Sequence, residues 1–385
     1  MPSESHFLSK ALSYRLKVMI VGDYMWPWYQ QACANALESL GCQVVRFGWF
    51  GDFSHWVADR TEPVYHSFWH RLQYRLRSGP VVWNVAMRLL QVANKEKPHV
   101  VFFYNVTIFG PSLVRKLKRL LPDALLCQYS NDNPFSADAK LGLWRHYLRS
   151  IPYFDVHFSF RHSNMEDLRY FGAHHVELLR AYFIPEDEYP VPYAEIPDRF
   201  RCDVVFAGHY EDDGRVEYLE AVCDAGFKLN LFGGGWQVAL SKLRHNSPLR
   251  KKYPVMPATG ADYRYALCGA KVALCFLSTL NRDTYTRRSF QIPAMKVTML
   301  SQHSDDLVSL YRPDADACFF KSKDEMLAKL KWLVDNDDIR NDIAASGYQK
   351  VYDDKHSVAG RMEALLKQLS VYQTKNVNIS NTNGH

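Results

Sequence analysis

Residues 285–296 have the sequence Y-T-R-R-S-F-Q-I-P-A-M-K and follow an apolar run, K-V-A-L-C-F-L, at residues 271–277. The apolar run is typical of a buried strand in a parallel sheet. The adjacent Arg287 and Arg288 stand near a predicted helix start beyond its carboxyl end. Ligands of open α/β sheets bind at this edge, where free N–H groups and arginines attract phosphate. The pattern predicts that both arginines hold a diphosphate, with ordinary surface charges on a helix as the alternative.

Strand-like and helix-like segments alternate along the chain in two series. The first βαβ unit, residues 17–47, lacks the G-x-G-x-x-G fingerprint of dinucleotide-binding domains. The alternation predicts an α/β fold with mostly parallel, doubly wound sheets. The predicted strands are residues 17–23, 43–47, 99–105, 124–129, 155–160 and 176–179 in the first series, and 202–208, 228–232, 271–277 and 297–300 in the second.

The boundary between the two series is marked by a change of composition. Residues 184–200 hold four prolines and five acidic residues, which favours an interdomain linker. We therefore predict a Rossmann-like N-terminal domain at residues 1–183 and a Rossmann-like C-terminal domain at residues 201–372. The polar tail, residues 373–385, is predicted to be disordered.

Length and composition limit the class of protein. The 385 residues suffice for two hydrophobic cores, and 47% hydrophobic with 23% charged residues is ordinary for a globular protein. A net charge of +6 is too small for the dense basic surface of a nucleic-acid-binding protein. The 8 cysteines form no C-x-x-C pair, which favours buried thiols over disulfides or a zinc site.

The relation of the chain to membranes is predicted from its apolar and basic segments. No apolar run approaches the roughly 20 residues that span a bilayer, and the N-terminus lacks the apolar core of a signal peptide, so we expect a cytoplasmic protein. Residues 66–77, H-S-F-W-H-R-L-Q-Y-R-L-R, and residues 115–119, R-K-L-K-R, mix apolar residues with cations. Such helices can lie on anionic lipid at the inner face of a membrane, with a solvated helix surface as the alternative.

Residues 288–294, R-S-F-Q-I-P-A, resemble the C-terminal-domain signature R-x-F-[E/Q]-I-P-A of CgeB-like glycosyltransferases. The resemblance continues over roughly the last half of the chain, and this sequence departs from it at two places. Gln291 stands where family members usually carry glutamate, and Met295 with Lys296 replaces a small Cys-Gly-like pair. The similar parts further along the chain are residues 305–311, 317–320, 343–351 and 356–361.

The resemblance implies the GT-B fold, in which two Rossmann-like domains face a cleft. The C-terminal domain would bind a nucleotide-diphosphate sugar, and the N-terminal domain would bind a hydroxyl acceptor on a glycan, lipid-linked saccharide or protein. Because arginines and helix dipoles neutralise a diphosphate, we expect neither a metal nor a cofactor. The D-x-D string at Asp314 and Asp316 is accordingly not expected to bind metal. A nucleotide-sugar epimerase or hydrolase and a non-catalytic sugar-binding subunit are the alternatives.

Candidate donor-binding residues follow the predicted strands of the C-terminal domain. Gly208 and His209 follow one strand, and glycine would let the backbone approach a phosphate or sugar closely. Gly233 and Gly234 follow the next strand, and Trp236 is a candidate for stacking on a base. A plain turn and a flexible loop are the alternatives. By resemblance, the motif adds Phe290 and Gln291, with Gln291 binding donor hydroxyls.

Three residues of the N-terminal domain are candidates for the base that deprotonates the acceptor hydroxyl in an inverting transfer. Asp132, in N-D-N-P, is the first candidate, because the string resembles an acidic-proline motif of CgeB-like proteins. Asp23, after the first strand, is the second, and His162 is the third. Helix capping and Asx-turns are the structural alternatives, and a retaining transfer needs no dedicated base.

Overall fold

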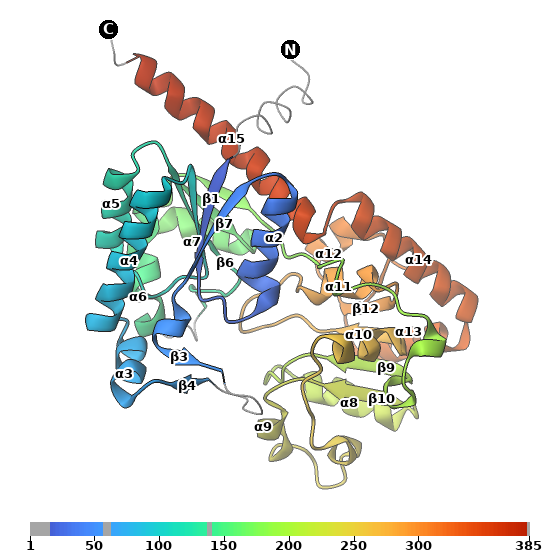
Figure 1. Cartoon of the computed structure of the whole chain (residues 1–385). Helices are drawn as coiled ribbons and strands as arrows, with labels where there is room; N and C mark the ends of the chain where they lie inside the picture. Colours follow the sequence, from blue (N-terminus) through green and yellow to red (C-terminus); the bar gives the residue numbers. More distant parts are fainter. Residues whose placement is uncertain (1–15, 57–62, 137–140, 383–385) are drawn as a thin grey trace, which may run out of the picture. The chain divides into compact units, whose positions relative to one another are not determined.

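The computed structural model describes residues 16–56, 63–136 and 141–382, with side chains in the last range from residue 142 to 372. These residues form two compact units (Figure 1). Unit 1 comprises residues 1–180 together with 358–385, and unit 2 comprises residues 181–357. Each unit is built on its own parallel sheet, as the alternation of strands and helices predicts.

Unit 1 contains a six-stranded parallel sheet with strand order β2-β1-β5-β6-β7-β8. A two-stranded antiparallel ribbon, β3 and β4, lies outside this sheet. The strands of the unit are β1 (Lys17–Gly22), β2 (Gln43–Gly48), β3 (Ser54–His55), β4 (Val64–Tyr65), β5 (Val100–Tyr104), β6 (Leu125–Ser130), β7 (Val156–Ser159) and β8 (Val176–Leu178). The α-helices are α2 (Ala32–Ser39), α3 (Phe68–Leu76), α4 (Pro80–Glu96), α5 (Pro111–Leu120), α6 (Leu141–Ser150), α7 (His162–Tyr170) and α15 (Val358–Thr382).

Helices cover both faces of this sheet, so its central strands are buried along their whole length. Every residue of β5 is buried, and so is every residue of β6. On one face, Phe103 of β5 lies in a cluster with Leu89 of α4 and Leu117 of α5. Figure 1 shows α4 and α5 on one side of the sheet and α2 on the other.

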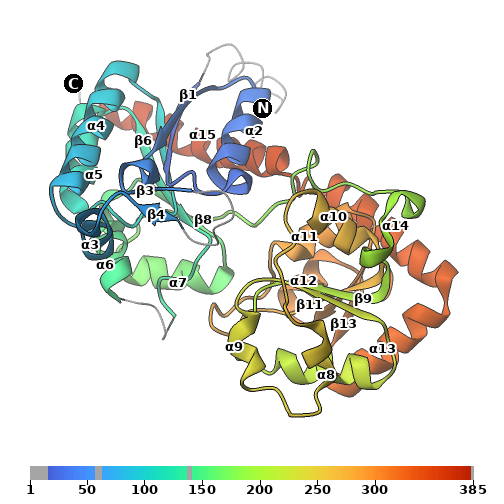
Figure 2. The ribbon, with the colours of Figure 1, turned by 60° about the horizontal axis from the view of Figure 1, so that its bottom comes forward.

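Unit 2 contains a five-stranded parallel sheet with strand order β10-β9-β11-β12-β13. Figure 2 shows α8 and α13 on one side of it and α10, α11 and α14 on the other. The strands are β9 (Cys202–Ala207), β10 (Leu229–Phe232), β11 (Ala270–Cys275), β12 (Thr298–Gln302) and β13 (Cys318–Phe320). The α-helices are α8 (Arg215–Asp224), α9 (Trp236–Leu240), α10 (Ala261–Cys268), α11 (Arg288–Ala294), α12 (Asp305–Leu310), α13 (Lys323–Asp335) and α14 (Asp337–Asp353).

The bounds of the units differ from the predicted domains at both ends of unit 2. The predicted linker, residues 184–200, belongs to unit 2, where Ile196 and Phe200 are buried against Ala266. The predicted C-terminal domain, residues 201–372, ends too late, because the chain returns to unit 1 at residue 358.

Helix α15 accounts for the second difference. It packs on α2 of unit 1 and buries Met362, Leu365 and Leu369. The tail predicted to be disordered, residues 373–385, continues α15 as far as Thr382, and residues 383–385 lie outside the described residues. No helix in the described ranges is both long and apolar enough to cross a membrane.

Candidate functional site

Arg288 carries a charge that no carboxylate of the described residues compensates. It is the first residue of α11, after the loop that follows β11. Its Nη2 donates to the carbonyl oxygen of Phe276 at 3.3 Å, whereas its Nε is buried without a hydrogen-bond partner. A half-buried guanidinium with unused donors can bind an anion without first breaking an ion pair.

The structure brings Arg288 together with four other predicted donor-binding residues. A Cβ on Gly208 would lie 2.8 Å from Nη1 of Arg288, so the guanidinium occupies the space that a side chain would fill. A Cβ on Gly233 would collide with the carbonyl oxygen of Gly208, and one on Gly234 would lie 3.0 Å from Cδ2 of His209. We call Gly208, His209, Gly233, Gly234 and Arg288 the Arg288 site. It lies at the carboxyl ends of β9 and β10, as predicted from the chain order.

A buried arginine, Arg215, fixes the backbone of the Arg288 site. Arg215 forms an ion pair with Asp213, with 2.5 Å between Nη2 and Oδ2. Its Nη1 donates to the carbonyl oxygen of His209 at 2.6 Å. Burial lowers the pKa of His209, and the charges of Arg288 and Arg215 lower it further, while Glu211 opposes them. His209 is therefore held uncharged beside a permanently charged guanidinium.

Two residues predicted to contact the donor are instead part of the core. Trp236 has none of its surface exposed, and its Nε1 donates to the carbonyl oxygen of Gly208 at 3.0 Å. Phe290 is likewise fully buried, with its ring against Tyr285 and His356. The prediction that Trp236 stacks on a base is wrong, and Phe290 has no surface with which to touch a donor.

Arg287 and Gln291 belong to a buried network around Glu188, which corrects their predicted roles. Nη2 of Arg287 lies 3.1 Å from Oε1 of Glu188, and Nε2 of Gln291 donates to the same oxygen. Oε1 of Gln291 accepts from the hydroxyl of Tyr263 at 2.9 Å. Oε2 of Glu188 accepts from the backbone N–H of Ile184 at 2.7 Å. The charge of Arg287 is thus compensated, and Gln291 is buried with both ends of its amide engaged.

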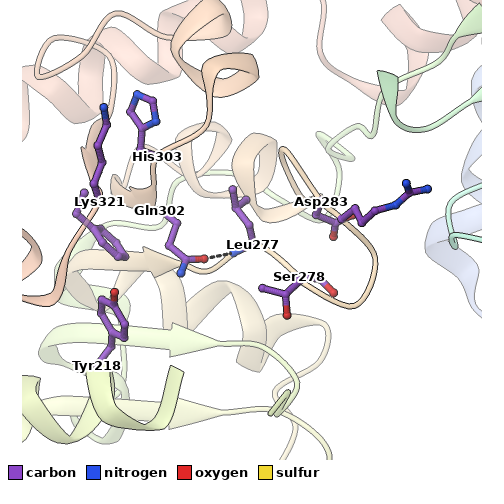
Figure 3. Close-up of a pocket in the computed structure, with 10 residues that line it drawn as sticks. Tyr218, Leu277, Ser278, Asp283, Gln302, His303 and Lys321 are labelled. Carbon is purple, nitrogen blue, oxygen red and sulfur yellow. Dashed lines mark hydrogen bonds between the residues drawn. The ribbon is translucent and has the colours of Figure 1, made fainter. Parts of the chain in front are cut away.

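A pocket of about 550 Å³ opens at the carboxyl ends of β11, β12 and β13. Figure 3 shows His303 and Lys321 above Tyr218, and Gln302 beside Leu277, whose backbone N–H donates to Oε1 of Gln302 at 2.7 Å. The volume suits a small ligand, and the cations at its rim favour a negatively charged one. The lining residues are Tyr218, Leu277, Ser278, Thr279, Arg282, Asp283, Gln302, His303, Phe320 and Lys321.

Sequence reasoning missed this β11–β13 pocket, although a signal for it was present. Gln302 is the last residue of β12, His303 follows it, and Lys321 follows β13. Polar residues at the carboxyl ends of neighbouring parallel strands gather at one edge. A hydrogen bond joins the pocket to the loop after β9: Oγ of Ser278 donates to Oε2 of Glu211 at 2.7 Å.

In unit 1 the structure brings two of the predicted base candidates together. Asp23 follows β1 and Asp132 follows β6, and the two carboxylates interact electrostatically. Burial raises the pKa of Asp23 and the charge of Asp132 adds to this, while hydrogen bonds from Met25 and Gln30 lower it. Asp132 is exposed and accepts from Nδ2 of Asn105 at 3.2 Å. The raised pKa makes Asp23 the stronger candidate for a base, which reverses the predicted order.

His162, the third candidate, begins α7 and is exposed. Nη2 of Arg180 lies 3.0 Å from its Nε2. Because arginine only donates hydrogen bonds, this contact uses the lone pair that a base needs. His162 is therefore the weakest of the three candidates.

No three His, Cys, Asp or Glu residues in the described ranges lie close enough together to hold a metal ion. The aspartates of the D-x-D string have other partners: Asp314 forms an ion pair with Lys329 at 2.6 Å, and Asp316 with Arg312 at 2.8 Å.

Comparison with known proteins agrees with this architecture. A family model described as glycosyl transferase-like matches residues 215–367. HepE from Anabaena, solved with UDP and glucose, aligns with a TM-score of 0.63 at 9% identity over 92% of this chain and 100% of that chain. Sucrose-phosphate synthase from Thermosynechococcus elongatus aligns with a TM-score of 0.66 at 11% identity over 93% of this chain and 100% of that chain. The chain has the GT-B fold. No curated protein matches its sequence.

A third structural relative extends this comparison. A glycosyltransferase from Rickettsia africae aligns with a TM-score of 0.60 at 9% identity, over 94% of this chain and 98% of that chain. The family match begins at Arg215 and contains both Arg288 and every residue that lines the β11–β13 pocket. The matched residues therefore include the part of unit 2 in which the uncompensated positive charge lies.

We expect Glu188→Gln to flatten the pH dependence of stability. Burial raises the pKa of Glu188, with Arg287 opposing. In the window between the ordinary and the raised pKa, the folded state keeps a proton that the unfolded chain has released, so stability falls as pH rises. The free energy of unfolding, measured by denaturant titration from about pH 4 to 7, should fall more steeply for the wild type.

The control for this experiment is Glu186→Gln, because Glu186 is an exposed carboxylate two residues away. The free energy of unfolding of Glu186→Gln should fall with pH as steeply as that of the wild type. If the free energy of unfolding of the wild type minus that of Glu188→Gln stays constant or rises with pH, the raised pKa of Glu188 is wrong.

Proposed function

We propose that the chain is a glycosyltransferase that moves a sugar from a nucleoside-diphosphate sugar to a hydroxyl acceptor. The observation that carries the proposal is the uncompensated guanidinium of Arg288 above Gly208, at the carboxyl ends of parallel strands in a GT-B fold. Support also comes from the glycosyl transferase-like match over residues 215–367. A resemblance to CgeB-like proteins in residues 288–294 points to the same chemistry.

In this proposal the Arg288 site stabilises the leaving diphosphate. When the bond between the anomeric carbon and the phosphate oxygen breaks, negative charge grows on the phosphate, and preformed donors lower the barrier most at that point. Glycine at positions 208, 233 and 234 lets the phosphate approach the backbone. Arg288 already supplies positive charge, so we propose a transfer that needs no divalent cation.

The β11–β13 pocket is the proposed place for the remainder of the donor. HepE was solved with UDP and glucose, so UDP-sugars are the first donors to test. Lys321 and His303 would supply further hydrogen-bond donors. The buried Glu188 network positions α11 and so acts on Arg288 through the backbone. Because Gln291 has a structural role in this network, its replacement of the family glutamate gives no reason to expect an inactive protein.

For an inverting transfer, Asp23 is the proposed base in unit 1. The acceptor oxygen attacks the anomeric carbon, its proton passes to the carboxylate of Asp23, and the nucleoside diphosphate departs. A base with a raised pKa accepts a proton more readily at neutral pH than an ordinary carboxylate does. Asp132 acts through Asp23 by raising that pKa.

Arg288→Ala should weaken the binding of a nucleoside diphosphate. Loss of a charge-assisted hydrogen bond corresponds to about a ten- to hundredfold rise in Kd. We would titrate UDP, GDP and dTDP into the wild-type protein by calorimetry, and then titrate whichever of them binds into the variant. Lys331→Ala removes an exposed charge from the same unit and is the control, for which an unchanged Kd is expected. Equal affinity of wild type and Arg288→Ala would remove Arg288 from the donor site.

Asp23→Asn should lower the rate of transfer by about 100- to 10,000-fold, the usual contribution of a general base. Asp132→Asn should keep most of the rate and move the acid limb of the kcat/KM profile to lower pH. This shift follows because removal of the Asp132 charge lowers the pKa of Asp23. The measurement is the pH dependence of nucleoside diphosphate release in the presence of acceptor. A normal rate for Asp23→Asn, with Asp132→Asn inactive, would restore Asp132 as the base.

We also propose that α3 rests on an anionic membrane surface. No residue of α3 is buried, and Phe68, Trp69 and Leu76 are 72%, 66% and 55% exposed. Arg71 and Arg75 of the same helix are exposed as well. Aromatic residues beside arginines are typical of helices that lie in the headgroup region of anionic bilayers. Helix α3 ends at Arg77, which has left-handed backbone angles, so α3 is a separate element from α4.

Replacing both Phe68 and Trp69 by serine should lower vesicle binding by at least about tenfold, because two large apolar side chains no longer enter the bilayer. The assay is co-sedimentation with vesicles of phosphatidylcholine and phosphatidylglycerol. Tyr170→Ser, at an 88% exposed aromatic elsewhere on unit 1, is the control and should bind like the wild type. Wild-type protein that stays in the supernatant, or binds neutral vesicles equally well, would contradict the proposal.

A further inference from the structure

Three tryptophans form an aromatic cluster on unit 1. None of them has a role in the proposed donor binding or proton transfer. The rings of Trp26 and Trp28 are stacked, with centroids 5.0 Å apart and 17° between their planes. The ring of Trp56 lies 5.3 Å from that of Trp26. Trp26 and Trp56 are each 38% exposed. The cluster thus offers a partly exposed aromatic surface. Aromatic rings of this size are usually buried in a core or at an interface.

The segment that carries Trp26 has an unusual and well-anchored backbone. Tyr24 has a φ of 54°, in the left-handed region that non-glycine residues rarely adopt. A single π-helical turn, Pro27–Gln31, follows Trp26, and such turns occur frequently at functional sites. Gln30 of this turn is 1% exposed and donates from Nε2 to the carbonyl oxygen of Tyr104 at 3.3 Å. Local strain that the surrounding structure maintains is itself an indication of a binding site.

Polar groups that suit hydroxyls lie next to the cluster. Asp23 precedes Trp26 by three residues, which places their Cα atoms within about 11 Å. Asp132 interacts electrostatically with Asp23, and Asn105 donates to Asp132. Carboxylates and amide oxygens accept hydrogen bonds from hydroxyl groups.

We infer that Trp26 and Trp56 bind a pyranose ring of a saccharide acceptor, with the hydroxyl to be glycosylated directed toward Asp23. This inference rests on the proposed function, since it names the class of acceptor for the same transfer. A pyranose has an apolar C–H face and a rim of hydroxyls. It therefore fits a surface that combines aromatic rings with hydrogen-bond acceptors, and the aromatic rings lose little conformational entropy on binding.

The charge around the cluster separates this surface from the α3 surface. Exposed arginines accompany the aromatics of α3, which suits anionic lipid. Carboxylates of Asp23 and Asp132 accompany Trp26, and their negative charge would repel an anionic headgroup or phosphate. An uncharged saccharide meets no such repulsion. The two surfaces are thus suited to different partners. Variants of α3 should lose vesicle binding, and variants of the tryptophan cluster should lose saccharide binding.

Saturation-transfer NMR on the full chain tests the inference directly. The probes are unbranched di- to tetrasaccharides of glucose, galactose, mannose and N-acetylglucosamine, without any donor present. We expect at least one to bind, with the strongest saturation on the C–H protons of one ring face. Trp26→Ala and Trp56→Ala should each raise its Kd by about five- to tenfold, in line with the usual contribution of an aromatic contact. Trp26→Phe should restore most of the affinity.

The control variant is Tyr170→Ala, which removes an exposed aromatic ring from α7 and should leave binding unchanged. Unfolding curves of each variant exclude loss of fold as the cause. Binding that is the same in Trp26→Ala, Trp56→Ala and the wild type overturns the inference. So does the absence of binding by all of these saccharides, and so does a loss of vesicle binding in Trp26→Ala as large as that in the α3 variant.

Failure of the inference can be told apart from failure of the proposed function by a donor-only measurement. Slow release of nucleoside diphosphate from a donor sugar in water requires the donor to bind in unit 2, but it requires no saccharide acceptor. If Trp26→Ala keeps this release at the wild-type rate while saccharide binding falls, both proposals hold. If release occurs but saccharide binding does not involve the tryptophans, only the inference fails. If no donor binds, the transferase proposal fails whatever the saccharides do.

Discussion

The close approach of Gly233 to the carbonyl group of Gly208 is the constraint on which the candidate donor site depends. No side chain fits between them, and the φ of 145° at Gly233 is accessible to glycine alone. The approach joins the carboxyl ends of β9 and β10, and it lets Trp236 donate its indole N–H to the Gly208 oxygen from inside the core. Gly208 in turn leaves the space that the Arg288 guanidinium occupies. Two missing Cβ atoms thus determine where the positive charge lies.

The short helix α11 depends on a second constraint, which is the burial of Glu188. A buried carboxylate is costly unless cations and donors surround it. Arg287, Gln291 and the backbone of Ile184 all supply such groups. These bonds join the beginning of unit 2 to α11, and they hold the side chain of Arg287 against Glu188. The two adjacent arginines therefore differ in charge compensation, because among the described residues only Arg287 has a carboxylate partner.

The order of strands and helices, and the residues at the ends of the strands, could be predicted from the sequence. The packing partners of individual side chains and helices could not. The rule that ligands bind at the carboxyl ends of parallel strands found Gly208, Asp23 and Asp132, because those positions follow from chain order alone. It could not show that Trp236 faces the core, since burial depends on what packs above a residue. The assignment of α15 failed for a related reason. Its apolar residues fit any helix of an α/β domain, and its partner α2 lies more than three hundred positions earlier in the chain.

The same distinction explains why unit 1 has two aromatic surfaces that local pattern does not separate. Tryptophan beside arginine in α3 and tryptophan beside aspartate after β1 are equally amphipathic, and only the fold shows which charges surround each group. A lipid surface is extended and anionic, so it favours a convex helix with cations. A saccharide is small and uncharged, so it favours rings held at a strand end where acceptors converge. The sign and convergence of the neighbouring charges therefore distinguish the two surfaces better than their hydrophobicity does.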